Sequence, residues 1–261
     1  MKIGVFDSGL GGLVMTKAVF GPLGHYDFAY LGDTAYLPYG ARSKEKIYER
    51  TRKGVDWLMR VKDAALVIIA CNTASIAALQ RIQREWLPAN FPDRRVLGIV
   101  VPTIEEAADA NNIGLIGTVS TVASGVYESE LLKIAPNRRF RAVATPLLVP
   151  LIENGGDKYA KEIISDYLAP IADVETLVLG CTHYPVYKGL IRRILPRARI
   201  ISQDEVLPPK LADYLRRHPE IEGRLSRGAG RFFGITDMTR GYIAAAEQLF
   251  GRAIEIERVD I

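Results

Sequence analysis

The stretch Ala64-Ala65-Leu66-Val67-Ile68-Ile69-Ala70-Cys71-Asn72-Thr73-Ala74-Ser75 is an unbroken apolar run that ends in a cysteine and small polar residues. An apolar run without alternation is typical of a strand buried on both faces of a parallel sheet. The same order recurs in Thr176-Leu177-Val178-Leu179-Gly180-Cys181-Thr182-His183-Tyr184-Pro185. Ligands bind at the carboxyl ends of strands in open parallel sheets. The sequence therefore predicts that Cys71 and Cys181, its only two cysteines, both lie at a ligand site.

Short apolar runs alternate with amphipathic stretches along the whole chain. This alternation predicts an α/β fold with mainly parallel sheets flanked by helices. Strands are predicted at 2–6, 27–31, 65–70, 96–100, 113–117, 140–144, 175–180, 198–202 and 231–235. Helices are predicted near 12–20, 43–61, 74–86, 103–110, 122–134, 157–171, 187–194, 206–217 and 238–250.

A weak internal repeat suggests two similar α/β halves. Gly4-Val5-Phe6-Asp7-Ser8-Gly9 and Gly114-Leu115-Ile116-Gly117-Thr118 both pass from an apolar strand into small polar residues, as the two cysteine segments do. We therefore predict a discontinuous first domain, residues 1–97 plus 207–261, and a second domain, residues 98–206. The active site is expected in the cleft between them.

Composition excludes several classes of protein. The net charge of the 261 residues is +4, and the basic residues are spread along the chain as pairs such as Arg192-Arg193, which favours solvated surfaces over binding of nucleic acid. No apolar stretch approaches the roughly 20 residues that cross a bilayer, and no leader precedes the first strand. Two isolated cysteines do not form a disulfide framework. The sequence thus predicts a cytoplasmic protein with no membrane contact.

The residues that follow each cysteine suit acid–base chemistry. A thiol beside the N-terminus of a helix is expected to have a lowered pKa. Asn72, Thr73 and Thr182 could hydrogen-bond a bound carboxylate or ammonium group. His183 lies two residues after Cys181 and could exchange a proton with it. Two thiols facing one substrate from opposite sides would form an acid–base pair.

Other interpretations of these residues stay open. A lone cysteine is often a small buried hydrophobic residue. Cys71, Cys181 and His183 supply at most three metal ligands, and the Cys-x-His spacing is not the usual one for zinc, so no metal is predicted. A cysteine hydrolase that uses Cys181 and His183 would leave Cys71 without a role. The glycine-rich stretch Asp7-Ser8-Gly9-Leu10-Gly11-Gly12 is either an anion site or a helix cap, and it matches neither the dinucleotide fingerprint nor the P-loop.

Several short motifs follow one another in a fixed order: Asp7-Ser8-Gly9 with Gly11-Gly12, Pro38-Tyr39-Gly40, Cys71-Asn72-Thr73-Ala74-Ser75, Gly117-Thr118 and Gly180-Cys181-Thr182-His183-Tyr184-Pro185. Together they resemble the signature set of glutamate racemase, over residues 3 to about 245. The resemblance implies a cofactor-independent racemase of the aspartate/glutamate racemase superfamily that supplies D-glutamate for peptidoglycan. The substrate would be L- or D-glutamate, and an aspartate or other amino-acid racemase of the same superfamily is the alternative.

The resemblance also implies roles for individual residues. Cys71 and Cys181 match the two catalytic bases, with Asp7 assisting Cys71 and His183 assisting Cys181. Glu153 matches an acidic residue near the histidine. The positions that match substrate-binding residues are Asp7, Ser8, Tyr39, Gly40, Asn72, Thr73, Thr118, Thr182 and His183.

The chain departs from the family pattern in two places. Thr145 occupies a position where members often carry a third cysteine, and Ile201-Ser202-Gln203-Asp204-Glu205 follows the usual form only loosely. Neither departure affects the two proposed bases. A homodimer is compatible with the resemblance, since family members are often dimers.

Overall fold

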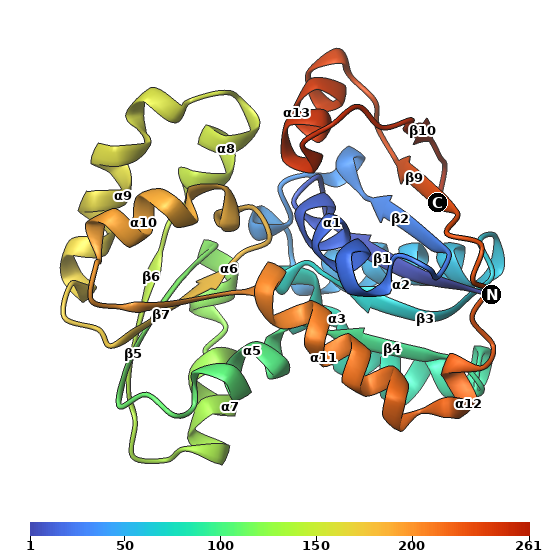
Figure 1. Cartoon of the computed structure of the whole chain (residues 1–261), viewed down its shortest axis with the longest axis horizontal. Helices are drawn as coiled ribbons and strands as arrows, with labels where there is room; N and C mark the ends of the chain where they lie inside the picture. The colour runs from blue at the N-terminus through green and yellow to red at the C-terminus, as the bar shows by residue number, and fades with distance from the viewer.

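The computed structural model describes the backbone of residues 1–261 and every side chain except that of Arg240. Within this description the strands form two sheets that lie side by side, each flanked by helices (Figure 1). Every strand pair in both sheets is parallel. The predicted α/β class with mainly parallel sheets is therefore confirmed.

The first sheet has the strand order β10-β9-β2-β1-β3-β4. The second sheet has the order β6-β5-β7-β8. The strands are β1 (Lys2–Asp7), β2 (Phe28–Gly32), β3 (Ala64–Ile69), β4 (Arg95–Gly98), β5 (Asn112–Gly117), β6 (Arg139–Ala144), β7 (Thr176–Gly180), β8 (Arg199–Ser202), β9 (Arg231–Ile235) and β10 (Glu257–Arg258).

Several helices begin at a residue whose side chain caps them. Thr118 and Thr239 accept hydrogen bonds from backbone N–H groups of the helices that follow them, and Ser43 does the same for Lys46. The helices are α1 (Gly12–Leu23), α2 (Lys44–Arg60), α3 (Asn72–Arg81), α4 (Leu87–Asn90), α5 (Val100–Ala107), α6 (Val119–Ala123), α7 (Val126–Ile134), α8 (Leu148–Glu153), α9 (Ala160–Leu168), α10 (Lys188–Ile194), α11 (Gln203–Arg217), α12 (Pro219–Glu222) and α13 (Arg240–Phe250).

Both sheets contain a point where the chain changes direction across the sheet. In the first sheet, β2 lies on one side of β1 and β3 on the other; in the second, β6 and β7 flank β5 in the same way. The loops that leave two such neighbouring strands diverge to opposite faces, which opens a crevice at their carboxyl ends. Cys71 follows β3 at one of these points and Cys181 follows β7 at the other.

The chain crosses between the sheets twice and returns to the first one. It leaves the first sheet between β4 and α5, and α11 follows the last strand of the second sheet. α11 then packs against α1, and β9 pairs with β2, so the end of the chain lies beside its beginning (Figure 1). A buried cluster that includes Leu13 from α1, Leu211 from α11 and Tyr184 after β7 extends across both halves. The domain limits near 97 and 206 stay a prediction.

Several predicted elements differ from the structure for local reasons. The helix predicted at 122–134 is split into α6 and α7, because Gly125 has a left-handed backbone with φ of 65°. The helix predicted at 157–171 is regular only over α9. The strand predicted at 96–100 ends at Gly98, and the chain enters α5 at Val100. The short elements α8 and β10 were not predicted.

Among the helices that the structure describes, none combines the length and the apolar character that a membrane span requires.

Candidate active site

A cavity of about 480 Å³ lies where the carboxyl ends of β3 and β7 face each other. Cys71 and Cys181 both line it, and each is 7% exposed. The first comes from the six-stranded sheet and the second from the four-stranded sheet. The structure therefore places the two cysteines in one cavity, as the sequence predicts.

Cys71 occupies the N-cap position of α3. Its sulfur accepts a hydrogen bond from the Ala74 backbone N–H at 3.4 Å, and the Ser8 hydroxyl donates to it at 3.3 Å. The pKa of Cys71 is raised to about 12, first by burial and then by the charge of the Asp7 carboxylate, although the hydrogen bonds from Ser8 and Ala74 lower it. The prediction of a lowered thiol pKa is therefore wrong for Cys71, because the loss of solvent outweighs the helix N-terminus.

Cys181 has a cationic neighbour instead. Its sulfur lies 3.8 Å from Nδ1 of His183, and Nε2 of the same ring lies 2.9 Å from a carboxylate oxygen of Glu153. Burial alone would lower the pKa of His183, but the bonds to Cys181 and Glu153 outweigh it and raise this pKa to about 10. At neutral pH the imidazole is thus positively charged, so it can donate one hydrogen bond to Cys181 and one to Glu153.

Asp7 lies behind the cavity wall and connects the two halves. Its side chain is fully buried; one carboxylate oxygen accepts the Gly9 backbone N–H at 2.9 Å, and the other accepts the Thr182 hydroxyl at 3.3 Å. Burial raises the pKa of Asp7, while the charge of His183 and the bonds from Gly9 and Thr182 lower it. Asp7 belongs to β1 and Thr182 follows β7, so this bond joins the loops of the two sheets.

Hydroxyl groups from both halves also meet at the cavity. The Thr73 hydroxyl lies 3.1 Å from that of Thr118, which caps α6. Both residues line the cavity. A bound ligand would therefore find hydrogen-bond donors from both sheets at this place.

A buried ion pair fixes the segment that carries Tyr39 and Gly40. Arg50 binds both carboxylate oxygens of Asp33, at 2.8 and 2.9 Å, and the Tyr39 hydroxyl donates to the same carboxylate at 2.7 Å. Burial and the Asp33 carboxylate raise the pKa of Tyr39, so its phenol stays protonated and donates. The Tyr39–Gly40 backbone is thereby held at the rim of the cavity.

The structure brings together the residues selected from the sequence. Those that line the cavity are Ser8, Tyr39, Gly40, Cys71, Asn72, Thr73, Thr118, Glu153, Cys181, Thr182 and His183; Asp7 contacts Thr182 from behind. Sequence reasoning missed Thr145, Val149 and Tyr242, which also line it. Thr145 was noted only as a departure from the family, and nothing in the sequence places Tyr242 of α13 near Cys71. Among the described side chains, no group of three histidines, cysteines or acids is placed to hold a metal ion.

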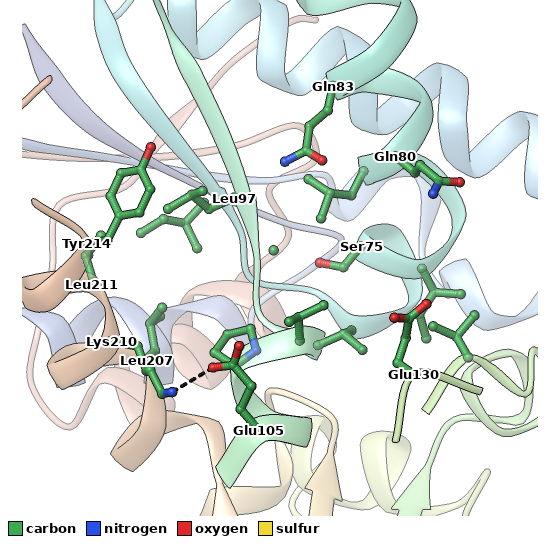
Figure 2. A pocket seen from close by; sticks show the side chains of 18 of the residues that line it. Ser75, Gln80, Gln83, Leu97, Glu105, Glu130, Leu207, Lys210, Leu211 and Tyr214 are labelled. Atoms are coloured by element: carbon green, nitrogen blue, oxygen red, sulfur yellow. Dashed lines mark hydrogen bonds and ion pairs between the residues drawn. The ribbon is translucent and has the colours of Figure 1, made fainter. Parts of the chain in front are cut away.

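A larger cavity, of about 660 Å³, lies along the later turns of α3 and faces α5, α7 and α11. Figure 2 shows Ser75, Gln80 and Gln83 on one side of it, and the ion pair between Lys210 and Glu105, at 2.7 Å, on the other. Its charged residues are partly exposed, and neither cysteine lines it. Cys71 and Cys181 therefore belong to the smaller cavity.

Comparison with known proteins agrees with this geometry. A model of the Asp/Glu/Hydantoin racemase family matches residues 23–205. Glutamate racemase of Roseobacter denitrificans is 37% identical over 243 residues, which cover 85% of this chain and 88% of that protein. The crystal structure of glutamate racemase from Thermus thermophilus in complex with beta-chloro-D-alanine is 35% identical, with a TM-score of 0.86 over 100% of this chain and 97% of that chain. The crystal structure of glutamate racemase from Francisella tularensis in complex with D-glutamate is 27% identical, with a TM-score of 0.89 over 100% of this chain and 97% of that chain. The chain therefore belongs to the Asp/Glu/Hydantoin racemase family, and its predicted resemblance to the glutamate racemases is confirmed.

Proposed function

We propose that this protein is a glutamate racemase that interconverts L- and D-glutamate without a cofactor, using Cys71 and Cys181 as its two bases. The observation that carries the proposal is that both cysteines line one cavity from two different sheets. A planar carbanion held between them could lose a proton to one sulfur and gain one from the other. The relatives named above, two of them bound to D-amino acids, support glutamate over aspartate as the substrate.

The two sulfurs would start each cycle in different states. His183 is charged at neutral pH and can stabilise a thiolate at Cys181, whereas the high pKa of Cys71 keeps that thiol protonated. This state suits the conversion of L- to D-glutamate, in which Cys181 accepts the α-proton and Cys71 donates one to the opposite face. For D-glutamate the roles are reversed, and Cys71 must first lose its proton. The positive charge of the substrate ammonium group would favour that loss.

Removal of the α-proton also requires stabilisation of the negative charge that moves onto the substrate carboxylate. Fixed hydrogen-bond donors in a site that excludes water supply such stabilisation. The Asn72 amide and the hydroxyls of Thr73 and Thr118 are donors of this kind. We propose that they, with Ser8, Thr182 and the Tyr39–Gly40 backbone, bind the substrate, and that Asp7 and Glu153 act through Cys71 and His183.

Circular dichroism of L- or D-glutamate, incubated with the purified protein and no added cofactor, tests the proposal. We expect racemisation by the wild type and at least a 1000-fold loss in Cys71→Ala and in Cys181→Ala, since each removes an essential proton carrier. Ser75→Ala is the matched control, because it truncates a buried residue in the helix after Cys71 but does not line the active-site cavity. In D2O, deuterium should appear mainly in the product enantiomer. Full activity in either cysteine variant would refute the two-base proposal.

One observation favours a second candidate function. Cys181, His183 and Glu153 form a continuous chain of side chains, as in a cysteine hydrolase. Such an enzyme would need Cys181 but not Cys71. Hydrolysis of an activated ester that survives Cys71→Ala, in a protein that does not racemise glutamate, would support this alternative.

The wider role follows from the resemblance. We propose that the enzyme supplies D-glutamate for peptidoglycan in the cytoplasm, as a homodimer and without nucleic acid. Expression in a bacterium that requires added D-glutamate should restore growth without it, and Cys71→Ala should not. Light scattering during size-exclusion chromatography gives the mass of the assembly.

A further inference from the structure

A buried pair of amide side chains lies next to Cys71. Nδ2 of Asn72 donates to Oε1 of Gln203 at 2.8 Å, and Nε2 of Gln203 donates to Oδ1 of Asn72, also at 2.8 Å. The two residues are 131 positions apart, and they are 2% and 1% exposed. Asn72 opens α3 and Gln203 opens α11, so the pair joins two helices that follow strands of different sheets.

The neighbours of this pair determine which way each amide faces. The Thr103 hydroxyl gives its single hydrogen to the Ile99 carbonyl, at 2.6 Å, so it can only accept from Gln203. This requirement places Nε2 of Gln203 towards Thr103 and Oε1 towards Asn72. Nδ2 of Asn72 must then face Gln203 Oε1, and Oδ1 of Asn72 takes hydrogen bonds from both Gln203 and the Tyr127 hydroxyl.

This arrangement uses the acceptor end of Asn72 fully and its donor end only in part. Oδ1 accepts two hydrogen bonds, one for each lone pair. Nδ2 carries two hydrogens and, within the described structure, donates one of them to Gln203. Asn72 also lines the active-site cavity. The remaining N–H is therefore the group that Asn72 can offer to a substrate.

From this geometry we infer that Gln203 is a positioning residue, which fixes the Asn72 amide so that it presents a donor to the substrate carboxylate. The inference rests on the proposed racemase function. Without Gln203, the Asn72 amide could rotate by half a turn and present its oxygen, which would repel a carboxylate. Tyr127 alone would not prevent this rotation, because a hydroxyl can accept a hydrogen bond as well as donate one.

The variant that tests the inference is Gln203→Met, which keeps the length of the side chain and removes both amide groups. We expect the KM for both enantiomers to rise and kcat/KM to fall about 10- to 100-fold, the effect of losing one hydrogen bond to a charged group. The fall must be equal for the two enantiomers, because their equilibrium constant is 1. Tyr127→Phe is the matched control: it removes the hydroxyl that donates to Asn72 and accepts from Gln203, but keeps both hydrogen bonds between the two amides, so its loss should be several-fold smaller.

A double-mutant cycle distinguishes positioning from a general structural role. If Gln203 acts through Asn72, Gln203→Met should lower kcat/KM less than about twofold in an Asn72→Ala background. Losses that multiply in the double variant, or wild-type kinetics of Gln203→Met, would overturn the inference. If Gln203→Met does not fold, as judged by its far-ultraviolet circular dichroism, Thr103→Val takes its place, since it removes the acceptor that orients Gln203.

A measurement without substrate separates this inference from the proposed function. The side-chain amide protons of Asn72, assigned in a ¹⁵N–¹H spectrum by their absence in Asn72→Ala, should exchange slowly in the wild type and much faster in Gln203→Met. Slow exchange in both proteins would contradict the positioning role even if the enzyme racemises glutamate. Absence of racemisation by the wild type would instead refute the proposed function and leave the amide measurement valid.

Discussion

Alanine at Gly11 should push the loop after β7, which carries Cys181 and His183, away from the loop between β1 and α1. Gly11 precedes α1, and its φ of −59° and ψ of −31° suit any residue, so the substitution adds a methyl group without straining the backbone. That methyl carbon would lie 2.6 Å from Cε1 of His183 and still closer to Nδ1 of His183 and to the Thr182 hydroxyl. Ordinary contact begins at 3.4 Å, so these groups must move by at least about 0.8 Å.

This displacement acts directly on the site, because Thr182 and His183 are buried and both line the cavity. A misplacement of about 1 Å can cost about 100-fold in rate, and we expect a fall in kcat of that size. Overpacking should also lower the free energy of unfolding by about 1–3 kcal/mol.

Racemisation assays and urea unfolding of Gly11→Ala and Gly189→Ala measure the two effects. Gly189 lies in α10 with only the end of Arg193 nearby, so alanine there should keep the activity and stabilise the protein by about 0.5–1 kcal/mol. A Gly11→Ala enzyme with wild-type kcat would show that Gly11 does not lie against Thr182 and His183.

Three further predictions concern buried charges. Glu153→Gln removes the negative charge beside His183 and should lower the histidine pKa from about 10. The fall of kcat/KM at alkaline pH should therefore begin at a lower pH than in the wild type, and coincident pH–rate profiles would contradict this. Because burial raises the pKa of Asp7, the folded state binds a proton there more tightly than the unfolded state, and the associated stability is lost as pH rises through the folded pKa. Asp7→Asn should therefore stabilise the protein at pH 7 by on the order of 1 kcal/mol and lower kcat. Thermal melts measure the first effect and racemisation assays the second. Arg50→Met leaves the Asp33 carboxylate buried and unpaired, so it should lower the free energy of unfolding in urea by about 3–5 kcal/mol. A decrease of less than about 1 kcal/mol would mean that the ion pair does not hold the Tyr39 segment.

Much of the fold was predictable because the strands of parallel sheets are buried on both faces. All six residues of β3 are buried and apolar, and such runs stand out without knowledge of their partners. The elements that escaped prediction are short or depend on distant contacts. β10 has two exposed residues and exists through its pairing with β9, and α8 contains a proline and only six residues.

The candidate site was predictable where its residues follow strands directly. Cys71, Thr118 and Cys181 each lie one or two residues after the end of a strand, so their place at the sheet edge follows from the local sequence. Tyr242 and Gln203 were not found, because their neighbours lie far away along the chain. The pKa of Cys71 was also misjudged, since the degree of burial depends on how the two halves enclose the cavity.

The unequal surroundings of the two sulfurs have a consequence for steady-state kinetics. In the proposed mechanism, an enzyme that has released D-glutamate holds a proton on Cys181 and none on Cys71, which is the opposite of the form that bound L-glutamate. The charged imidazole beside Cys181 and the raised pKa of Cys71 make this second form the less stable of the two. Before it can accept another L-glutamate, the free enzyme must exchange protons with water or convert a D-glutamate back. At high concentrations of a single enantiomer, this isomerisation of the empty enzyme becomes a step of every cycle, and its rate sets an upper limit on turnover.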